Sequence, residues 1–182
     1  APGLYVGGRK DLADIEDRIS DAPAALPARP DPETHRYMPV SVQGRFDSAE
    51  IHVLVSLRDQ GAGYRIIQPF ETGGRRILVD RGFVPATEKN APPATGSAVV
   101  TGNLHWPDEV DWFTPEPDVD ENIWFARDVP VLAGGLDAEP VLVIAREIEG
   151  AQRGEPLPVT ATGIPNNHLG YAVQWFGLAV AL

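Results

Sequence analysis

Histidines are the side chains of this sequence best suited to bind a metal, because neutral imidazole is a common ligand. The chain has four, His35, His52, His105 and His168, and none has a second histidine at helical or strand spacing. The first three are interpreted as isolated surface or strand histidines. His168 differs because it follows Pro165 and the capping residues Asn166 and Asn167, which predict the start of a helix. The positive end of the helix dipole keeps such an imidazole neutral and able to ligate.

Catalytic signatures are missing from the sequence. It contains no G-x-S-x-G elbow, no phosphate-binding Walker loop, no H-E-x-x-H zinc helix and no EF-hand calcium loop. The chain has no cysteine, which excludes thiolate zinc sites, iron–sulfur clusters, thiol nucleophiles and disulfides. We therefore predict that the protein is not an enzyme and has no catalytic residues.

The acidic loop, residues 110–121, is dense in carboxylates but lacks the alternating spacing and central glycine of a calcium loop. We interpret it as a solvated acidic loop. Trp106, Trp112 and Phe113 lie in or beside it, and aromatic residues of this kind are usually core plugs. The alternative is that they form a hydrophobic surface offered to a partner.

Arg81 follows a strongly apolar strand in the stretch ILVDRGFVP, residues 77–85. The simplest interpretation is an ion pair with Asp80 that closes the end of the strand. The functional alternative is an arginine that clamps a carboxylate or a propionate in a bidentate manner.

Composition limits the class of partner. The 182 residues, 43% of them hydrophobic, suit one domain with a proper core. The net charge of −11 argues against nucleic acid and anionic lipid headgroups as partners, because both would repel the protein.

Hydrophobic periodicity predicts a mainly β protein. Residues 9–20 have the helical period, and a proline-rich connector follows at 21–33. From there the period is two, and turn residues separate eight runs: 37–46, 50–57, 64–71, 75–85, 97–106, 121–130, 139–148 and 157–163. One helical turn is expected at 129–136. The prediction is a small antiparallel β-barrel or sandwich of 6–8 strands with a short N-terminal helix and a C-terminal helix.

The tail at 169–182 is apolar except for Gln174, and it is shorter than the roughly 20 residues that a membrane span needs. His168, Tyr171 and Trp175 share one helical face, while small residues occupy another. Two interpretations follow: a buried C-terminal helix of the domain, or the first part of a transmembrane helix.

Several motifs resemble a known family. The stretches GYRIIQPFE at 63–71, ILVDRGFVP at 77–85 and WFARDVP at 124–130 precede a tail, PNNHLGYAVQWFGLA, at 165–179. Together with GRF at 44–46, VTGNL at 100–104 and FTPEPD at 113–118, they resemble the surfeit locus protein 1 family, called Shy in yeast, of cytochrome c oxidase assembly factors.

The resemblance implies a domain organisation and a location. Residues 1–8 would be the end of a first transmembrane helix, 9–165 an extracytoplasmic β-rich domain, and 166–182 the start of a second transmembrane helix. Members of the family reside in the bacterial inner membrane, with the domain in the periplasm, or in the mitochondrial inner membrane. The acidic balance favours the periplasm.

The resemblance also implies a function. The protein would bind haem a and assist its insertion into the catalytic subunit of cytochrome c oxidase, with haem a synthase as a further partner. His168 would be the iron ligand, and Tyr171 and Trp175 would flank the porphyrin. Two alternatives stay open: a haem-independent scaffold that holds the oxidase subunit during assembly, and a soluble barrel that binds a small apolar ligand.

Overall fold

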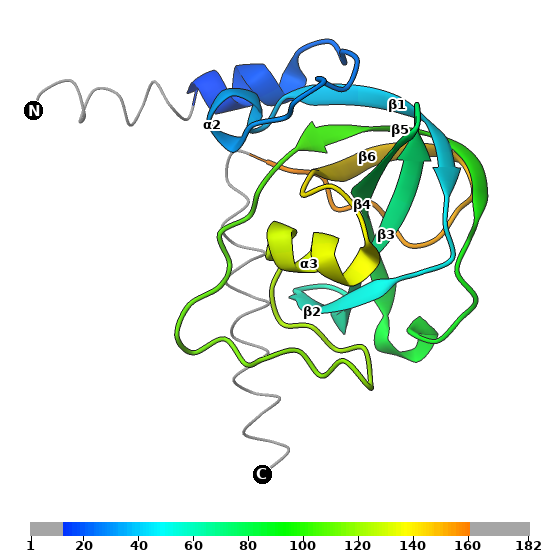
Figure 1. The fold of residues 1–182 in the computed structure, drawn as a ribbon. Coiled ribbons are helices and arrows are strands. Elements are labelled where there is room, and N and C mark those ends of the chain that lie inside the picture. Colours follow the sequence, from blue (N-terminus) through cyan, green and yellow to red (C-terminus); the bar gives the residue numbers. More distant parts are fainter. Residues whose placement is uncertain (1–12, 161–182) are drawn as a thin grey trace, which may run out of the picture.

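Six strands form one continuous sheet in the computed structural model of this chain, which describes residues 13–160 (Figure 1). A helix at 13–20 precedes them. The remaining elements are, in chain order, α2 (Pro32–His35), β1 (Pro39–Phe46), β2 (Ile51–Leu57), β3 (Gly61–Thr72), β4 (Arg75–Pro85), the 3-10 turn η1 (Ala86–Glu88), β5 (Gly96–Leu104), α3 (Val129–Leu136) and β6 (Leu142–Gly150).

The sheet closes on itself as a barrel. Its strand order is β1-β5-β6-β4-β3-β2, and a second pairing of β1 with β3, through Arg45–Glu71 and Phe46–Phe70, joins five of the strands in a ring. Strand β2 extends the sheet from β3. Closure satisfies the backbone groups that an open sheet would leave at its edges. The predicted mainly β barrel with a short N-terminal helix is confirmed.

One pairing departs from the antiparallel expectation, because β4 and β6 are parallel. Parallel neighbours need a long crossover connection. Here the chain between them forms β5, a connection of 24 residues (105–128) and α3 before it returns as β6. This connection, which we call the β5–α3 connection, contains the acidic loop.

Two apolar layers hold the barrel together. Inside the ring, Phe46, Phe70, Ile77 and Val79 pack with the inward residues of β1, β5 and β6. Outside it, α3 covers the opposite face of β3, β4 and β6 and one face of β2 through a second apolar cluster of buried residues: Val129, Leu132, Ala133, Leu136, Ile51, Val53, Ile67, Leu78, Leu142 and Ile144. Alternate side chains of a strand point to opposite faces, so β4 contributes to both layers.

The predicted turns and helix are largely observed. Gly73 and Gly74 both have positive φ, +55° and +78°, which fits the two-residue hairpin turn between β3 and β4. The helix predicted at 129–136 is α3, and Asp137 ends it in the left-handed conformation.

Two predicted strands are wrong within the described residues. The run at 121–130 forms only the isolated bridges Asp118–Ile123 and Val53–Trp124, because it lies against the edge of β2 and then enters α3. Residues 157–160 of the run at 157–163 form no strand. The predicted C-terminal helix and the end of the predicted first transmembrane helix lie outside the described residues. Among residues 13–160, no helix has the length and apolarity to cross a membrane.

Candidate functional site

The sequence predicted three site residues, His168, Tyr171 and Trp175, and all three lie outside the residues that the structure describes. Their roles stay predictions. The described residues contain four other features: a buried charge cluster, a second buried polar network, a groove and the acidic loop.

The predicted ion pair between Asp80 and Arg81 is wrong. Both side chains are fully buried within β4, not at the end of a strand. Adjacent residues of a strand project to opposite faces, so Arg81 points toward the ring of Phe46, 3.8 Å from its centroid, while Asp80 points the other way.

Arg81 does not clamp a carboxylate in the described structure. Its guanidinium donates to Gln68 Oε1 at 3.0 Å, to the carbonyl of Ala94 at 3.1 Å and to the carbonyl of Ala151. Burial lowers the pKa of Arg81 to about 10. Arg81 therefore ties two loops to one end of the barrel.

Asp80 is the centre of a buried charge cluster that also contains Arg65, Arg127 and Glu109. Asp80 Oδ2 accepts from Arg65 and Arg127 at 2.9 Å each, and Oδ1 accepts from the backbone N–H of Gly82 at 2.9 Å. Glu109 completes the cluster by accepting from the Arg127 guanidinium at 2.8 Å and 3.1 Å and from its backbone N–H at 2.9 Å. Two carboxylates thus balance two guanidiniums.

The charge cluster shifts the pKa values of Glu109, Arg127 and Arg65. Burial alone would raise the pKa of Glu109, but the charge and hydrogen bonds of Arg127 lower it to about 2. Burial would also lower the pKa of Arg127, and Glu109 and Asp80 instead raise it. The pKa of Arg65 is lowered by burial and by the neighbouring Arg127. Glu109 and Arg127 are therefore both ionised at neutral pH.

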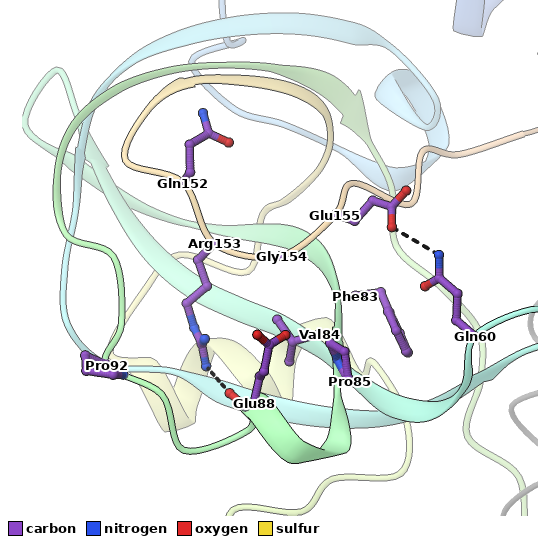
Figure 2. A pocket seen from close by; sticks show the side chains of 10 residues that line it. All are labelled: Gln60, Phe83, Val84, Pro85, Glu88, Pro92, Gln152, Arg153, Gly154 and Glu155. Carbon is purple, nitrogen blue, oxygen red and sulfur yellow. Dashed lines mark hydrogen bonds between the residues drawn. The ribbon is translucent and has the colours of Figure 1, made fainter.

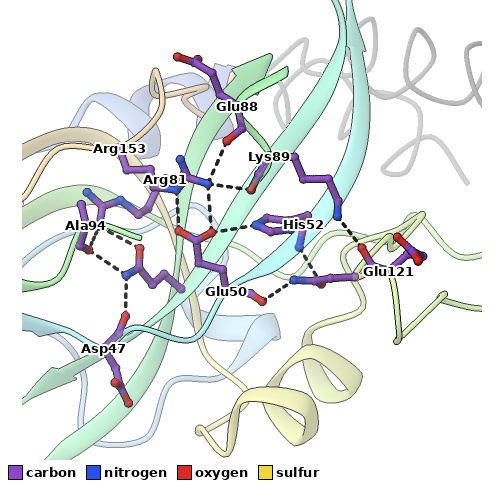
Figure 3. A network of polar contacts seen from close by, with 11 residues as sticks. Asp47, Glu50, His52, Arg81, Glu88, Lys89, Ala94, Glu121 and Arg153 are labelled. Atoms are coloured by element: carbon purple, nitrogen blue, oxygen red, sulfur yellow. Dashed lines mark hydrogen bonds and ion pairs between the residues drawn. The ribbon is translucent and has the colours of Figure 1, made fainter. Parts of the chain in front are cut away.

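A second buried network joins β2 to the last described segment (Figure 3). Glu50 receives two bonds from Arg153, at 2.6 Å and 3.1 Å, and lies 2.8 Å from His52 Nε2. Burial would raise the pKa of Glu50, but its hydrogen bonds with His52 and Arg153 lower it. Asn122 donates to the Glu50 carbonyl at 2.8 Å and accepts from the backbone N–H of His52 at 3.2 Å, so the network also holds the end of the β5–α3 connection.

A polar groove of about 500 Å³ lies between the end of β4, η1 and the segment at 152–155 (Figure 2). Phe83 and Val84 form its apolar side, and Glu88 and Arg153 project from opposite segments. Gln60 bridges to Glu155 at 3.1 Å across it. Haem pockets are enclosed mainly by apolar side chains, whereas charged and amide side chains make up much of the wall of this groove.

Each histidine of the described residues makes a contact within the fold. His35 Nδ1 accepts from the backbone N–H of Asp31 at 2.9 Å, and His52 is bonded to Glu50. His105 stacks on Tyr37 with the ring centroids 4.9 Å apart, and burial, together with the charge of Arg127, lowers its pKa to about 4. Residues 13–160 contain no group of three or more metal-binding side chains.

The acidic loop is solvated, as predicted, but the interpretation of its aromatics as core plugs is wrong for two of them. Trp112 is 85% exposed and Phe113 46% exposed, with ring centroids 3.6 Å apart. Trp106 is the exception, since it is partly buried against both apolar layers and donates to the carbonyl of Pro140 at 2.9 Å. Val110 and Val119 add further exposed apolar surface to the loop.

Sequence reasoning missed Arg65, Glu109 and Arg127, and it missed the pair of Glu50 with Arg153. One signal was available: Asp80 follows three apolar residues and precedes Gly82-Phe83-Val84, so its burial and its need for a cation could have been inferred. The identity of its partners could not, because they lie 15 and 47 positions away.

These features define a class of protein: a small closed β-barrel whose buried charges hold a long acidic connection against its wall. A family model adds the specific relationship. The SURF1 family model matches residues 8–180, and this chain belongs to the SURF1 family.

Individual relatives agree with the family match. Surfeit locus protein 1 of Homo sapiens is 31% identical, with 93% of this chain and 65% of the relative covered. The Mus musculus protein of the same name is 30% identical over 94% of this chain and 64% of its own length. A SURF1-like protein of Monosiga brevicollis is 30% identical over 92% of this chain and 72% of the relative. The chain thus spans just under two thirds of the length of the mouse and human relatives.

Proposed function

We propose that this chain belongs to a membrane-anchored assembly factor for cytochrome c oxidase, which binds haem a and assists its insertion into the catalytic subunit, and that residues 9–165 form its extracytoplasmic domain. The observation that carries the proposal is membership of the SURF1 family over residues 8–180, a range that includes the tail motif with His168. The barrel would lie on the periplasmic side of a bacterial inner membrane, with haem a synthase as a second partner.

His168 is the proposed ligand of the haem a iron, with Tyr171 and Trp175 beside the porphyrin. Two arguments support this assignment. A histidine at a helix start is kept neutral by the dipole, so its nitrogen is free to bind iron. The family model also covers the tail motif in which His168 lies, and this motif carries the resemblance from which the ligand role follows. Bound haem would supply the redox cofactor of the oxidase, and the chain would hold and release it.

The test is the optical spectrum of the full-length protein purified from cells that synthesise haem a. We expect a haem a signal in the wild type and its loss in His168→Ala, while His35→Ala serves as a control because His35 makes only a local bond in the described structure. Equal haem a content in wild type and His168→Ala would remove His168 from the ligand role.

A haem-independent scaffold is the second candidate, and a specific observation favours it. Among the described residues, the large apolar side chains that are exposed lie in the acidic loop, with the exception of Val131 on α3. Exposed apolar surface of this kind marks a site of protein–protein contact. Crosslinking of the protein to the catalytic subunit in cells unable to make haem a would support the scaffold, and dependence of the crosslink on haem a would contradict it.

A further inference from the structure

The acidic loop is closed at its base by the charge cluster. Glu109 precedes the loop and Arg127 follows it, and the two residues share three hydrogen bonds of 2.8–3.1 Å. Arg127 also binds Asp80 in the barrel wall. The segments before and after the loop thus meet at the buried guanidinium of Arg127. These contacts fix the direction in which the loop leaves the barrel.

The returning arm of the loop is fastened to the barrel as well. The backbone of Trp124 donates to the His52 carbonyl at 2.9 Å and accepts from Leu54 at 2.8 Å, which extends the sheet beyond β2. Lys89 donates to the carbonyl of Glu121 at 2.5 Å. The part of the loop that extends beyond these fastened arms is its tip, residues 110–120, and it is available for contact with other molecules (Figure 1).

The tip displays an ordered aromatic pair. Asp111 accepts from the backbone N–H of Phe113 at 2.9 Å and from the Thr114 hydroxyl at 3.1 Å, and its carbonyl accepts from the backbone N–H of Thr114 at 3.1 Å. This turn holds Trp112 against Phe113. A tryptophan side chain has only two torsions to fix on association, and tryptophan is enriched among the residues that dominate binding energy.

Charge restricts what the tip can bind. The tip has four exposed carboxylates, and two more flank it, while no lysine or arginine lies between residues 107 and 126; the six are Asp108, Asp111, Glu116, Asp118, Asp120 and Glu121. An anionic membrane surface or nucleic acid would be repelled. A second copy of this chain, with a net charge of −11, would be repelled as well.

From these observations we infer that the tip is a docking surface for a partner protein that presents an apolar pocket ringed by lysine and arginine. Trp112 enters the pocket, and the carboxylates pair with the basic rim. This inference rests on the proposed assembly function, in which the partner is the catalytic subunit of the oxidase. The rim charges act on the association rate and its salt dependence, and the buried tryptophan acts on the lifetime of the complex.

The test measures binding of the full chain to the detergent-solubilised catalytic subunit. Trp112→Ala should weaken binding about 30-fold, the loss typical of a dominant interface residue. The variant Asp118→Asn/Asp120→Asn/Glu121→Gln should slow association about tenfold at about 0.05 M salt and have little effect at about 0.5 M salt. Val131→Ala is the matched control for an exposed apolar side chain, and it should leave binding unchanged.

The outcomes separate this inference from the proposed function. Wild-type protein that does not bind the subunit contradicts the function itself. Wild-type binding that both variants retain overturns the docking surface and leaves the function standing. A shift of Trp112 emission on addition of uncharged phosphatidylcholine vesicles, identified by its loss in Trp112→Phe, would assign the tip to a lipid surface and overturn the protein partner.

Discussion

Replacing Asp80 by asparagine should destabilise the barrel strongly. The carboxylate accepts two charged hydrogen bonds of 2.9 Å, from Arg65 and Arg127, and a third from Gly82. Asparagine keeps the shape but removes the negative charge, so two guanidiniums share the buried cluster with the single carboxylate of Glu109. Removing one partner of a buried ion pair costs about 3–5 kcal/mol, which is a large part of a typical unfolding free energy of about 5–15 kcal/mol.

A second substitution tests the cause. If excess positive charge destabilises Asp80→Asn, then Arg65→Met in the same chain should recover about 1–2 kcal/mol, because Arg127 and Glu109 then remain as a neutral pair. Asp120→Asn is the control, since Asp120 is exposed in the acidic loop and its loss should change stability by less than about 0.5 kcal/mol.

The assay is urea unfolding, followed by tryptophan emission and circular dichroism, with the free energies compared at equal slope. A loss below about 1 kcal/mol in Asp80→Asn would refute the assignment of a tightly coupled buried cluster. So would a double variant whose destabilisation equals the sum of the two single variants, because independent sites add.

Further predictions concern pH, backbone and loop. In the unfolded chain His105 has a pKa near 6.5 and Glu109 a pKa near 4.5, whereas in the native protein these values are about 4 and about 2. The free energy of unfolding should therefore be highest above pH 6.5 and should fall as the pH drops toward 2. Each residue contributes about 3 kcal/mol to this fall, and His105→Asn should remove the part between pH 6.5 and 4 in urea titrations. Gly82→Ala should prevent folding at ordinary temperature, measured as loss of the cooperative thermal transition, because φ is +92° and a Cβ would lie 1.9 Å from the Glu155 carbonyl oxygen; a normal transition would contradict this. Trp112→Ala should leave the melting temperature within about 2 °C of wild type, and a larger fall would place Trp112 in the core.

Local chemistry made much of the barrel predictable. Gly73-Gly74 between two runs of period two identifies a hairpin without knowledge of the rest of the chain, because both residues adopt positive φ at little cost. The helix at 129–136 was predictable for a similar reason: it begins with Val129-Pro130 after Asp128, and its apolar residues have helical spacing. These signals require only neighbours in sequence.

The pairing of β4 with β6 and the position of the tryptophans were not predictable in this way. β4 and β6 carry apolar residues on both faces, and such runs do not reveal whether a neighbour is parallel. Trp112 and Trp106 have similar surroundings in sequence, yet one is 85% exposed and the other packs on both apolar layers. The difference arises from the charge cluster, which directs the loop away from the barrel after Glu109.

Apolar residues in place of the charge cluster would not fix the arrangement of the loop equally well. Buried ion pairs seldom stabilise a protein more than apolar residues of the same volume, and what they add is specificity of arrangement. Arg127 binds Glu109 before the loop, its own backbone after the loop is bonded to the same carboxylate, and its guanidinium reaches Asp80 in β4. Variants of this cluster should therefore impair stability and partner binding together, whereas variants of the tip should impair binding alone. If Glu109→Gln weakens partner binding as much as the tip variants do but leaves the free energy of unfolding unchanged, a shared role for the cluster is contradicted.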